Sequence, residues 1–488
     1  MQRRHWSAGA VGLFLALVSV WQIAGTARGL EITTVRSAAV PLTIVTPEEE
    51  SQDARPLVLI GHGFAGSSVV MRGLALSLAH AGYTVALWDF DGHGANGRPL
   101  AAEARPDSLL ANVEAALAEA DVRGLVIPGR VAIVGHSMGS GVALAFGQTH
   151  PETAATVAVS PVSWTVTPTL PRNLLLLAGS REPRFVRNAE QLLAEAGGAG
   201  GDAATGTARK LLVIPGVEHI SILFAPATHR AVREWLDGTF GPQPGAAVYT
   251  DRRVLWYGLG LLGTLLVGAA LAGLVAEPDS PPYHPLWRRL GALVGGALGA
   301  TLLLWLVGKA GLELRNLLGL LVGGYVMVWF GVAGSLGLLL LRARLELPSR
   351  RAAAGGMLAF GALWLGVGLM GQSVWLPWLL IPRRLLLWPL GGLLLLPWFL
   401  TVGEATGDAG AGGRIGWWLA HSGTLAGGLF LALRLSPSLG FLVIILPLFP
   451  IILGFHALAA GPCRKSWSFA LSGALFVSWI LLAVFPLQ

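Results

Sequence analysis

Ser137 lies in the pentapeptide Gly135-His136-Ser137-Met138-Gly139, which is the strongest indication of chemistry in this sequence. The apolar run before it, 131–134, is typical of a strand, and the run after it, 140–148, is typical of a helix. In a strand–turn–helix of this G-x-S-x-G type, the turn lifts the serine hydroxyl above the sheet. The start of the helix also directs N–H groups toward any oxyanion that forms there. The pattern predicts that Ser137 is a nucleophile. Because the chain has 66 glycines, chance matches occur and the remaining parts of such a site must also be found.

A second glycine-rich turn, His62-Gly63-Phe64-Ala65-Gly66, directly follows an apolar strand-like run. Glycines at this place allow the backbone to approach the serine closely. We expect the N–H groups of Phe64 and Met138 to form the two-donor oxyanion hole that acyl transfer requires. Removal of one such donor typically costs about 100- to 1000-fold in rate. The alternative is an ordinary glycine-rich turn between a strand and a helix.

An acid and a histidine each follow a later apolar strand-like run. Glu182 ends the turn Gly179-Ser180-Arg181-Glu182, and His219 ends the turn 215–219. A carboxylate placed there can hold a histidine in one tautomer and stabilise its cation, so we expect Glu182 to orient His219 and His219 to act as the general base. The alternative for Glu182 is a solvated acid paired with Arg181 or Arg184. The neighbouring Glu218 is interpreted as a surface charge.

The order Ser137, Glu182, His219 is the serine–acid–histidine order of the α/β-hydrolase fold. Residues 31–237 resemble that family, in its branch of esterases, lipases and serine-aminopeptidase-like enzymes. The resemblance is carried by Gly61-His62-Gly63-Phe64, Trp88-Asp89-Phe90-Asp91-Gly92-His93-Gly94, Gly135 to Gly139, Gly179 to Glu182, and Glu218-His219. It implies a doubly wound, mostly parallel sheet, and it implies that Asp89 and His93 shape the floor of the site without reacting. His62, Gly63, Gly135, His136 and Gly139 are expected to support the two turns.

Two departures from the family pattern bear on function. The acid of the family is usually Asp, whereas Glu182 stands at that position here. Lipases of this type usually insert a lid of tens of residues after the sixth strand, but only 161–173 separate Ser160 from the next strand-like run. The serine is therefore expected in an open cleft or in one covered by another part of the chain.

The composition indicates that most of the remaining chain lies in a membrane. The 488 residues are 53% hydrophobic and 12% charged, whereas soluble proteins have about 25% charged residues. From Glu31 to Asp251 there are 15 basic and 21 acidic residues, and from Arg252 onward 16 basic and 6 acidic. The high pI thus arises from basic residues between apolar runs, which does not indicate nucleic-acid binding. The single cysteine, Cys463, excludes an intrachain disulfide, and no metal-type spacing is present.

The predicted organisation has four parts: a signal anchor or signal peptide at 1–30, an α/β-hydrolase domain at 31–237, a linker at 238–251, and an all-α polytopic transmembrane domain at 252–488. About eight spans are expected in the last part, at 254–276, 290–308, 317–341, 354–373, 385–403, 415–434, 438–460 and 467–486. His421 and His456 lie within these spans and are expected to form hydrogen bonds between helices.

The positive-inside rule favours an N-terminus on the inner face. That topology places on inner loops Arg3, Arg4, Arg288, Arg289, Arg342, Arg344, Arg350, Arg351, Arg414, Arg464 and Lys465. It places on outer loops the smaller set Arg252, Arg253, Lys309, Arg315, Arg383, Arg384 and Arg434. The hydrolase domain would then lie on the outer face of the plasma membrane.

The sequence predicts an integral membrane serine hydrolase that cleaves acyl esters, of membrane lipids or lipid-linked substrates in particular, and needs no cofactor and no metal. Small soluble esters are the alternative substrates. A serine peptidase of the same fold remains open, as does a transporter or scaffold whose hydrolase-like domain binds a ligand without turnover. Oligomeric state and the cleavage of residues 1–30 are not determined by the sequence.

Overall fold

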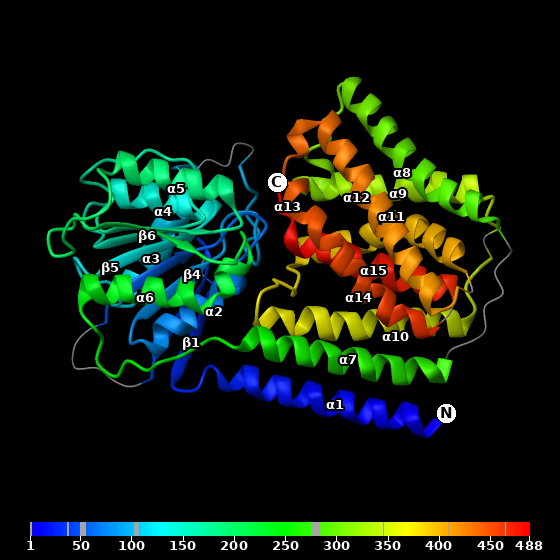
Figure 1. Cartoon of the computed structure of the whole chain (residues 1–488), viewed down its shortest axis with the longest axis horizontal. Coiled ribbons are helices and arrows are strands. Elements are labelled where there is room, and N and C mark those ends of the chain that lie inside the picture. The colour runs from blue at the N-terminus through cyan, green and yellow to red at the C-terminus, as the bar shows by residue number, and fades with distance from the viewer. Residues whose placement is uncertain are drawn as a thin grey trace.

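The N-terminal part of the chain is a helix-covered mixed sheet, and the C-terminal part is a bundle of apolar helices (Figure 1). This computed structural model describes residues 2–36, 39–48, 55–101, 107–275, 284–344, 346–407, 409–463 and 465–488. Arg464, which the predicted topology places on an inner loop, lies outside these residues.

One eight-stranded sheet has the order β1-β2-β4-β3-β5-β6-β7-β8. Its strands are β1 (Leu30–Arg36), β2 (Pro41–Pro47), β3 (Leu57–Gly61), β4 (Thr84–Trp88), β5 (Val131–His136), β6 (Ala155–Val159), β7 (Leu174–Gly179) and β8 (Arg209–Ile214). Strands β1, β2 and β4 pair antiparallel, and all pairs from β4 to β8 are parallel. The predicted mostly parallel sheet is confirmed, and the structure adds β1 and β2 at its edge.

Helices cover both faces of this sheet. The faces alternate along each strand: Leu57 and Leu59 belong to the core beneath α3 and α4, whereas Val58 and Ile60 belong to the core beneath α2 and α6. The first face carries α3 (Leu110–Val122), α4 (Met138–Thr149) and α5 (Pro183–Glu195), and the second carries α2 (Ser68–His80) and α6 (Pro226–Phe240). The central strands are buried on both sides, which explains their uniformly apolar sequences.

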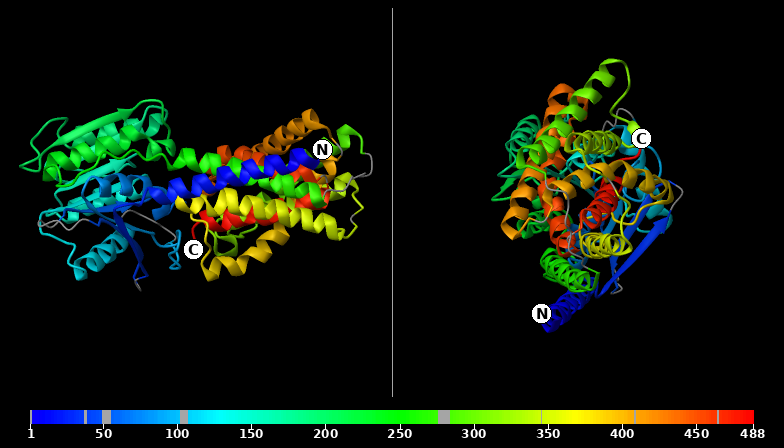
Figure 2. Two further views of the ribbon diagram at one scale, coloured as in Figure 1. Left: turned by 90° about the horizontal axis from the view of Figure 1, so that it is seen from below. Right: turned by 90° about the vertical axis from the view of Figure 1, so that its right-hand side faces the viewer.

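The helical part is built from long apolar helices. They are α7 (Arg253–Val275), α8 (Leu286–Lys309), α9 (Gly323–Leu341), α10 (Arg350–Leu363), α11 (Pro382–Thr406), α12 (Ala411–Leu435), α13 (Leu442–Ile445), α14 (Phe449–Ala460) and α15 (Ser466–Val484). The N-terminal helix α1 (Gln2–Gly25) packs along α7 (Figures 1 and 2). By length and composition, eight helices among the described residues could cross a membrane: Ser7–Gly25, Arg253–Ala272, Leu286–Lys309, Gly323–Leu341, Arg350–Ser373, Pro382–Thr406, Leu446–Cys463 and Ser466–Val484.

Two of the expected spans look different in the structure. The segment expected at 415–434 forms the 25-residue helix α12, but its composition is less apolar than that of the eight candidates. The segment expected at 438–460 is broken into α13, a 3₁₀ turn (Leu446–Leu448) and α14. Pro447 and Pro450 lie at the break, and proline lacks the N–H that a continuous helix needs.

The two parts meet through specific contacts at one end of the helical bundle. After α15 the chain returns to the sheet, where the N–H of Leu487 donates to Gly92 O at 2.9 Å and the N–H of Leu100 donates to Leu487 O at 2.8 Å. Arg384 at the start of α11 is buried and donates to Gly92 O at 2.6 Å and to Phe485 O at 2.7 Å. The loop after β4 is therefore held directly by the helical part.

Candidate active site

Ser137 occupies a strained turn between β5 and α4. Its backbone has φ 53° and ψ −116°, a conformation that L-residues rarely adopt. A Cβ added at Gly135 would lie 1.9 Å from Gly139 O, and one added at Gly139 would lie 2.7 Å from Gly61 O. Only glycine fits at both flanking positions, which is the physical reason for the G-x-S-x-G pattern.

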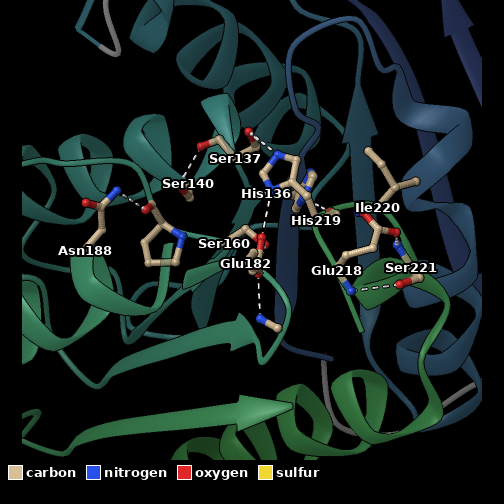
Figure 3. A network of polar contacts seen from close by, with 12 residues as sticks. His136, Ser137, Ser140, Ser160, Glu182, Asn188, Glu218, His219, Ile220 and Ser221 are labelled. Atoms are coloured by element: carbon tan, nitrogen blue, oxygen red, sulfur yellow. Dashed lines mark hydrogen bonds and ion pairs between the residues drawn. The ribbon is translucent and has the colours of Figure 1, made fainter. Parts of the chain in front are cut away.

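His219 lies between Ser137 and Glu182 (Figure 3). Its Nε2 is 2.9 Å from Ser137 Oγ, and its Nδ1 is 2.9 Å from Glu182 Oε2. The imidazole comes from the loop after β8, is 17% exposed, and stacks on Phe185 of α5 with 4.3 Å between ring centroids. The predicted nucleophile, base and acid are thus brought into one hydrogen-bonded chain.

Glu182 is fixed by donors on its second oxygen. Its Oε1 accepts from Ser160 Oγ at 2.7 Å and from the Gly179 N–H at 2.6 Å. The side chain is buried, and its ion-pair partner among the described residues is His219 rather than Arg181 or Arg184. Both oxygens therefore act as acceptors, which orients the carboxylate toward the histidine.

The expected oxyanion donors, Phe64 and Met138, lie on the two turns that approach each other at Ser137. A Cβ added at Gly63 would lie 2.9 Å from His136 Nδ1 and 3.1 Å from Ser137 Cβ, so the turns touch there. Within the described part of the chain, neither the Phe64 N–H nor the Met138 N–H donates a hydrogen bond. Two free donors beside the serine match the requirement of acyl transfer.

Three buried histidines and Asp89 support these turns. His62 Nε2 accepts from the Phe90 N–H at 3.1 Å, so its Nδ1 carries the proton and donates to Gly63 O at 2.7 Å. His136 Nε2 donates to the backbone carbonyl of His219 at 2.9 Å. Burial lowers the pKa of His62, and it holds the pKa values of His93 and His136 well below the ordinary value. These imidazoles are therefore neutral scaffold groups.

Asp89 anchors the start of α2 to the loop after β4. Its oxygens accept from the N–H of Ser68 at 2.7 Å and of Ala95 at 2.8 Å. Glu218 is exposed, and its carboxylate accepts from the N–H groups of Ile220 and Ser221. Neither acid contacts Ser137 or His219 through its side chain in the described hydrogen bonds, consistent with supporting and surface roles.

The helical part also contacts the turns of the site, through a residue that was not predicted from the sequence. The ring of Phe441, just before α13, stacks on the ring of Phe64 with 3.6 Å between centroids and 12° between planes. Ser160 and Phe185 were also not predicted as site residues. The positive φ of Ser160 (47°) is a structural signal that a sequence does not display.

The histidines of the helical part form hydrogen bonds between helices. His421 accepts from the Trp398 indole at 2.8 Å, and His456 Nε2 lies 3.0 Å from Ser472 Oγ. Among the described residues, no group of three or more His, Cys, Asp or Glu side chains is placed to hold a metal ion.

Comparison with known proteins places the N-terminal part in a known fold. Residues 52–196 match the family described as "Serine aminopeptidase, S33". No curated protein matches the sequence. Similar solved structures include a soluble variant of monoglyceride lipase from Saccharomyces cerevisiae (16% identity, 43% of this chain and 95% of that chain, TM-score 0.33). They also include an esterase/lipase from an uncultured bacterium (18% identity, 43% of this chain and 84% of that chain, TM-score 0.33). A third is a bacterial membrane phospholipase A (15% identity, 47% of this chain and 92% of that chain, TM-score 0.34). The N-terminal part has an α/β-hydrolase-like fold, and the family match supports a hydrolase.

Proposed function

We propose that this protein is a membrane-anchored serine hydrolase that cleaves acyl esters of lipid or lipid-linked substrates. The observation that carries the proposal is the continuous hydrogen-bonded chain from Ser137 through His219 to Glu182, with distances of 2.9 Å at both links. A protein that only binds a ligand has no need of a base aligned with a hydroxyl and an acid aligned with that base.

The proposed reaction follows from the atoms at the site. Ser137 Oγ attacks the acyl carbonyl while His219 Nε2 takes its proton, and Glu182 keeps the Nδ1 proton on the side away from the serine. The N–H groups of Phe64 and Met138 stabilise the oxyanion. His219 then returns the proton to the leaving alcohol, and water activated by the same histidine releases the acid.

An apolar cavity in the helical part supports a substrate with an acyl chain. It lies between the segment 367–376, α14 and α15, and its walls are aliphatic and aromatic side chains. Ile445 lines it, and Ile445 lies one helical turn after Phe441, whose ring covers Phe64. One wall of the cavity thus lies one helical turn from the ring that contacts the turn with the proposed oxyanion donor.

We also propose the four-part organisation at 1–30, 31–237, 238–251 and 252–488, with the hydrolase domain on the outer face. The close packing of α1 on α7 favours an uncleaved anchor: a Cβ at Gly12 would lie 2.6 Å from Gly263 O. If α12 is counted as a span, successive connections between spans lie at opposite ends of the helical bundle. The ends at Gly25, Arg253, Pro382 and Val484 then all lie on the side of the sheet, in agreement with the contacts of Arg384 and Leu487.

A peptidase of the same fold remains the second candidate because the matching family is described as a serine aminopeptidase. Such an enzyme needs a carboxylate to hold the terminal ammonium of its substrate. The acids on these loops already accept hydrogen bonds: Glu182, Glu218 and Asp89 accept at least two each, and Asp91 accepts one from Asn96 Nδ2 at 3.0 Å. This favours the ester substrate.

The first experiment is labelling of the full-length protein with a fluorophosphonate probe. We expect labelling of the parent and of Ser163→Ala, whose serine is exposed and outside the site, but not of Ser137→Ala. Ester and peptide substrates are then compared as p-nitrophenyl esters and amino-acid p-nitroanilides. Equal labelling of parent and Ser137→Ala would refute the proposal.

The acyl-chain cavity is tested by filling it. Ile445→Trp should lower kcat/KM for long-chain esters relative to short-chain ones by about tenfold or more, because each methylene denied burial costs about 0.8 kcal/mol. Val443→Trp, on the same short helix but 56% exposed, is the matched control. A parallel loss for both chain lengths would show that the cavity does not hold the acyl chain.

A further inference from the structure

Arg72 on α2 lines a second large cavity, and this one lies between the sheet and the helical part. The cavity is bounded by β2, the first turn of α2, the loop 94–98, and the segment 377–382 that precedes α11. Segment 377–382 connects two candidate spans, Arg350–Ser373 and Pro382–Thr406. The cavity therefore lies at the depth where a bilayer surface would meet the protein.

The Arg72 guanidinium has no partner, although it is largely buried. Within the described part of the chain it makes no hydrogen bond and no ion pair. Burial lowers its pKa, the neighbouring Arg253 lowers it further, and Asp89 acts in the opposite direction. A largely buried guanidinium whose N–H groups have no acceptor is costly, so this position favours an acceptor from outside, and an anion most of all.

Neither nearby carboxylate accepts a hydrogen bond from Arg72. Asp251 forms a two-pronged ion pair with Arg253, with its oxygens 2.9 Å and 2.8 Å from Arg253 Nε and Nη2. Asp89 is held by two backbone N–H groups, at Ser68 and Ala95. The first turn of α2 is itself capped by Asp89 and by Ser67 Oγ. Arg72 therefore lines the cavity with guanidinium N–H groups that have no acceptor in the described part of the chain.

We propose that this cavity binds a phosphate-bearing ligand through Arg72. A guanidinium presents paired N–H groups whose geometry fits phosphate oxygens, and the cavity is wide enough for a group larger than the ion itself. The phosphate can belong to a phospholipid headgroup at the membrane surface or to a soluble phosphate. This site is separate from the proposed reaction, because Arg72 contacts none of Ser137, His219 and Glu182.

The test uses the full-length protein in detergent, with Arg72→Gln, Arg72→Lys and the control Arg123→Gln, an exposed residue paired with Glu119 on α3. Thermal unfolding is followed with inorganic phosphate against chloride at equal ionic strength. Native mass spectrometry measures retention of dioleoyl phosphatidylglycerol against dioleoylglycerol, which has the same chains and no phosphate.

We expect phosphate, the phospholipid or both to stabilise the parent and Arg123→Gln. Arg72→Gln should bind about tenfold or more weakly, as expected for loss of a charge-assisted hydrogen bond, and Arg72→Lys should fall between. Without ligand, Arg72→Gln should melt at the same temperature as the parent or higher, because a largely buried guanidinium without a hydrogen-bond acceptor is removed. A response to the phospholipid alone identifies a headgroup site, and a response to inorganic phosphate alone identifies a soluble ligand. If neither probe affects the parent, or if Arg72→Gln responds as the parent does, the proposal is wrong.

Discussion

Replacement of Glu182 by Gln tests the proposed chemistry most sharply, because the structure determines how the new amide must lie. A glutamine has one acceptor oxygen, whereas both oxygens of Glu182 are acceptors. The oxygen is expected to face Ser160 Oγ and the Gly179 N–H, since two donors point there. The NH₂ group then faces His219 Nδ1. That nitrogen must become an acceptor, which moves the imidazole proton to Nε2, toward Ser137.

A proton on Nε2 blocks the general base while the geometry of the site stays intact. Loss of the correct tautomer in a serine–histidine–acid site lowers kcat by about 10⁴, which corresponds to about 5.4 kcal/mol. The assay is hydrolysis of a short p-nitrophenyl ester together with the rate of fluorophosphonate labelling, and circular dichroism reports on folding. Glu218→Gln is the matched control: it changes the adjacent loop acid, which is exposed and outside the hydrogen-bonded chain, and should stay within about twofold of the parent. A folded Glu182→Gln protein within tenfold of the parent would refute the assignment of Glu182.

Two further predictions concern the groups that support the site. The His136 imidazole is neutral in the folded protein because burial holds its pKa well below the ordinary value. In the unfolded chain the same imidazole takes up a proton as the pH falls through about 6.5. The folded state therefore loses stability as the pH falls below that value. Between pH 7.5 and 5.5, the free energy of unfolding measured in urea should therefore fall by about 1.4 kcal/mol less in His136→Gln than in the parent. An equal fall in both proteins would contradict burial of the neutral imidazole. Gly63→Ala should lower kcat for short esters by up to about 100-fold, because its Cβ would press on His136 and Ser137 and displace the Phe64 donor. Gly238→Ala, where a Cβ meets open space, should leave kcat unchanged.

The sequence predicted the parts of the site that lie at the ends of apolar strands. Ser137, Glu182 and His219 each follow an apolar run, 131–134, 174–178 and 211–214, and parallel strands bring their carboxyl ends to one edge of a sheet. Ser160 and Phe185 could not be predicted as site residues from the pattern of apolar strands. Their roles depend on a backbone angle and a ring orientation that arise only once β6, β7 and α5 are packed together.

Edge strands and proline-interrupted spans were harder to predict from the sequence than the central strands. In β1 and β2 polar and apolar residues alternate, as in Leu30–Arg36, and neither strand has the continuous apolar run by which the central strands were recognised. The stretch 438–460 is apolar apart from Ser438 and His456, so hydropathy predicts one span. Pro447 and Pro450 instead divide it into α13 and α14.

This break has a consequence for the covering of the site. A continuous helix would carry its first residues straight along the bundle, whereas the interrupted chain places Phe441 against Phe64. Phe64 then has two roles at once: its ring contacts the helical part, and its free N–H is a proposed oxyanion donor. A shift of the segment around α13 would therefore move that donor relative to Ser137. If the proposed membrane anchoring is correct, a change in the bilayer that shifts this segment would change the rate of the proposed reaction.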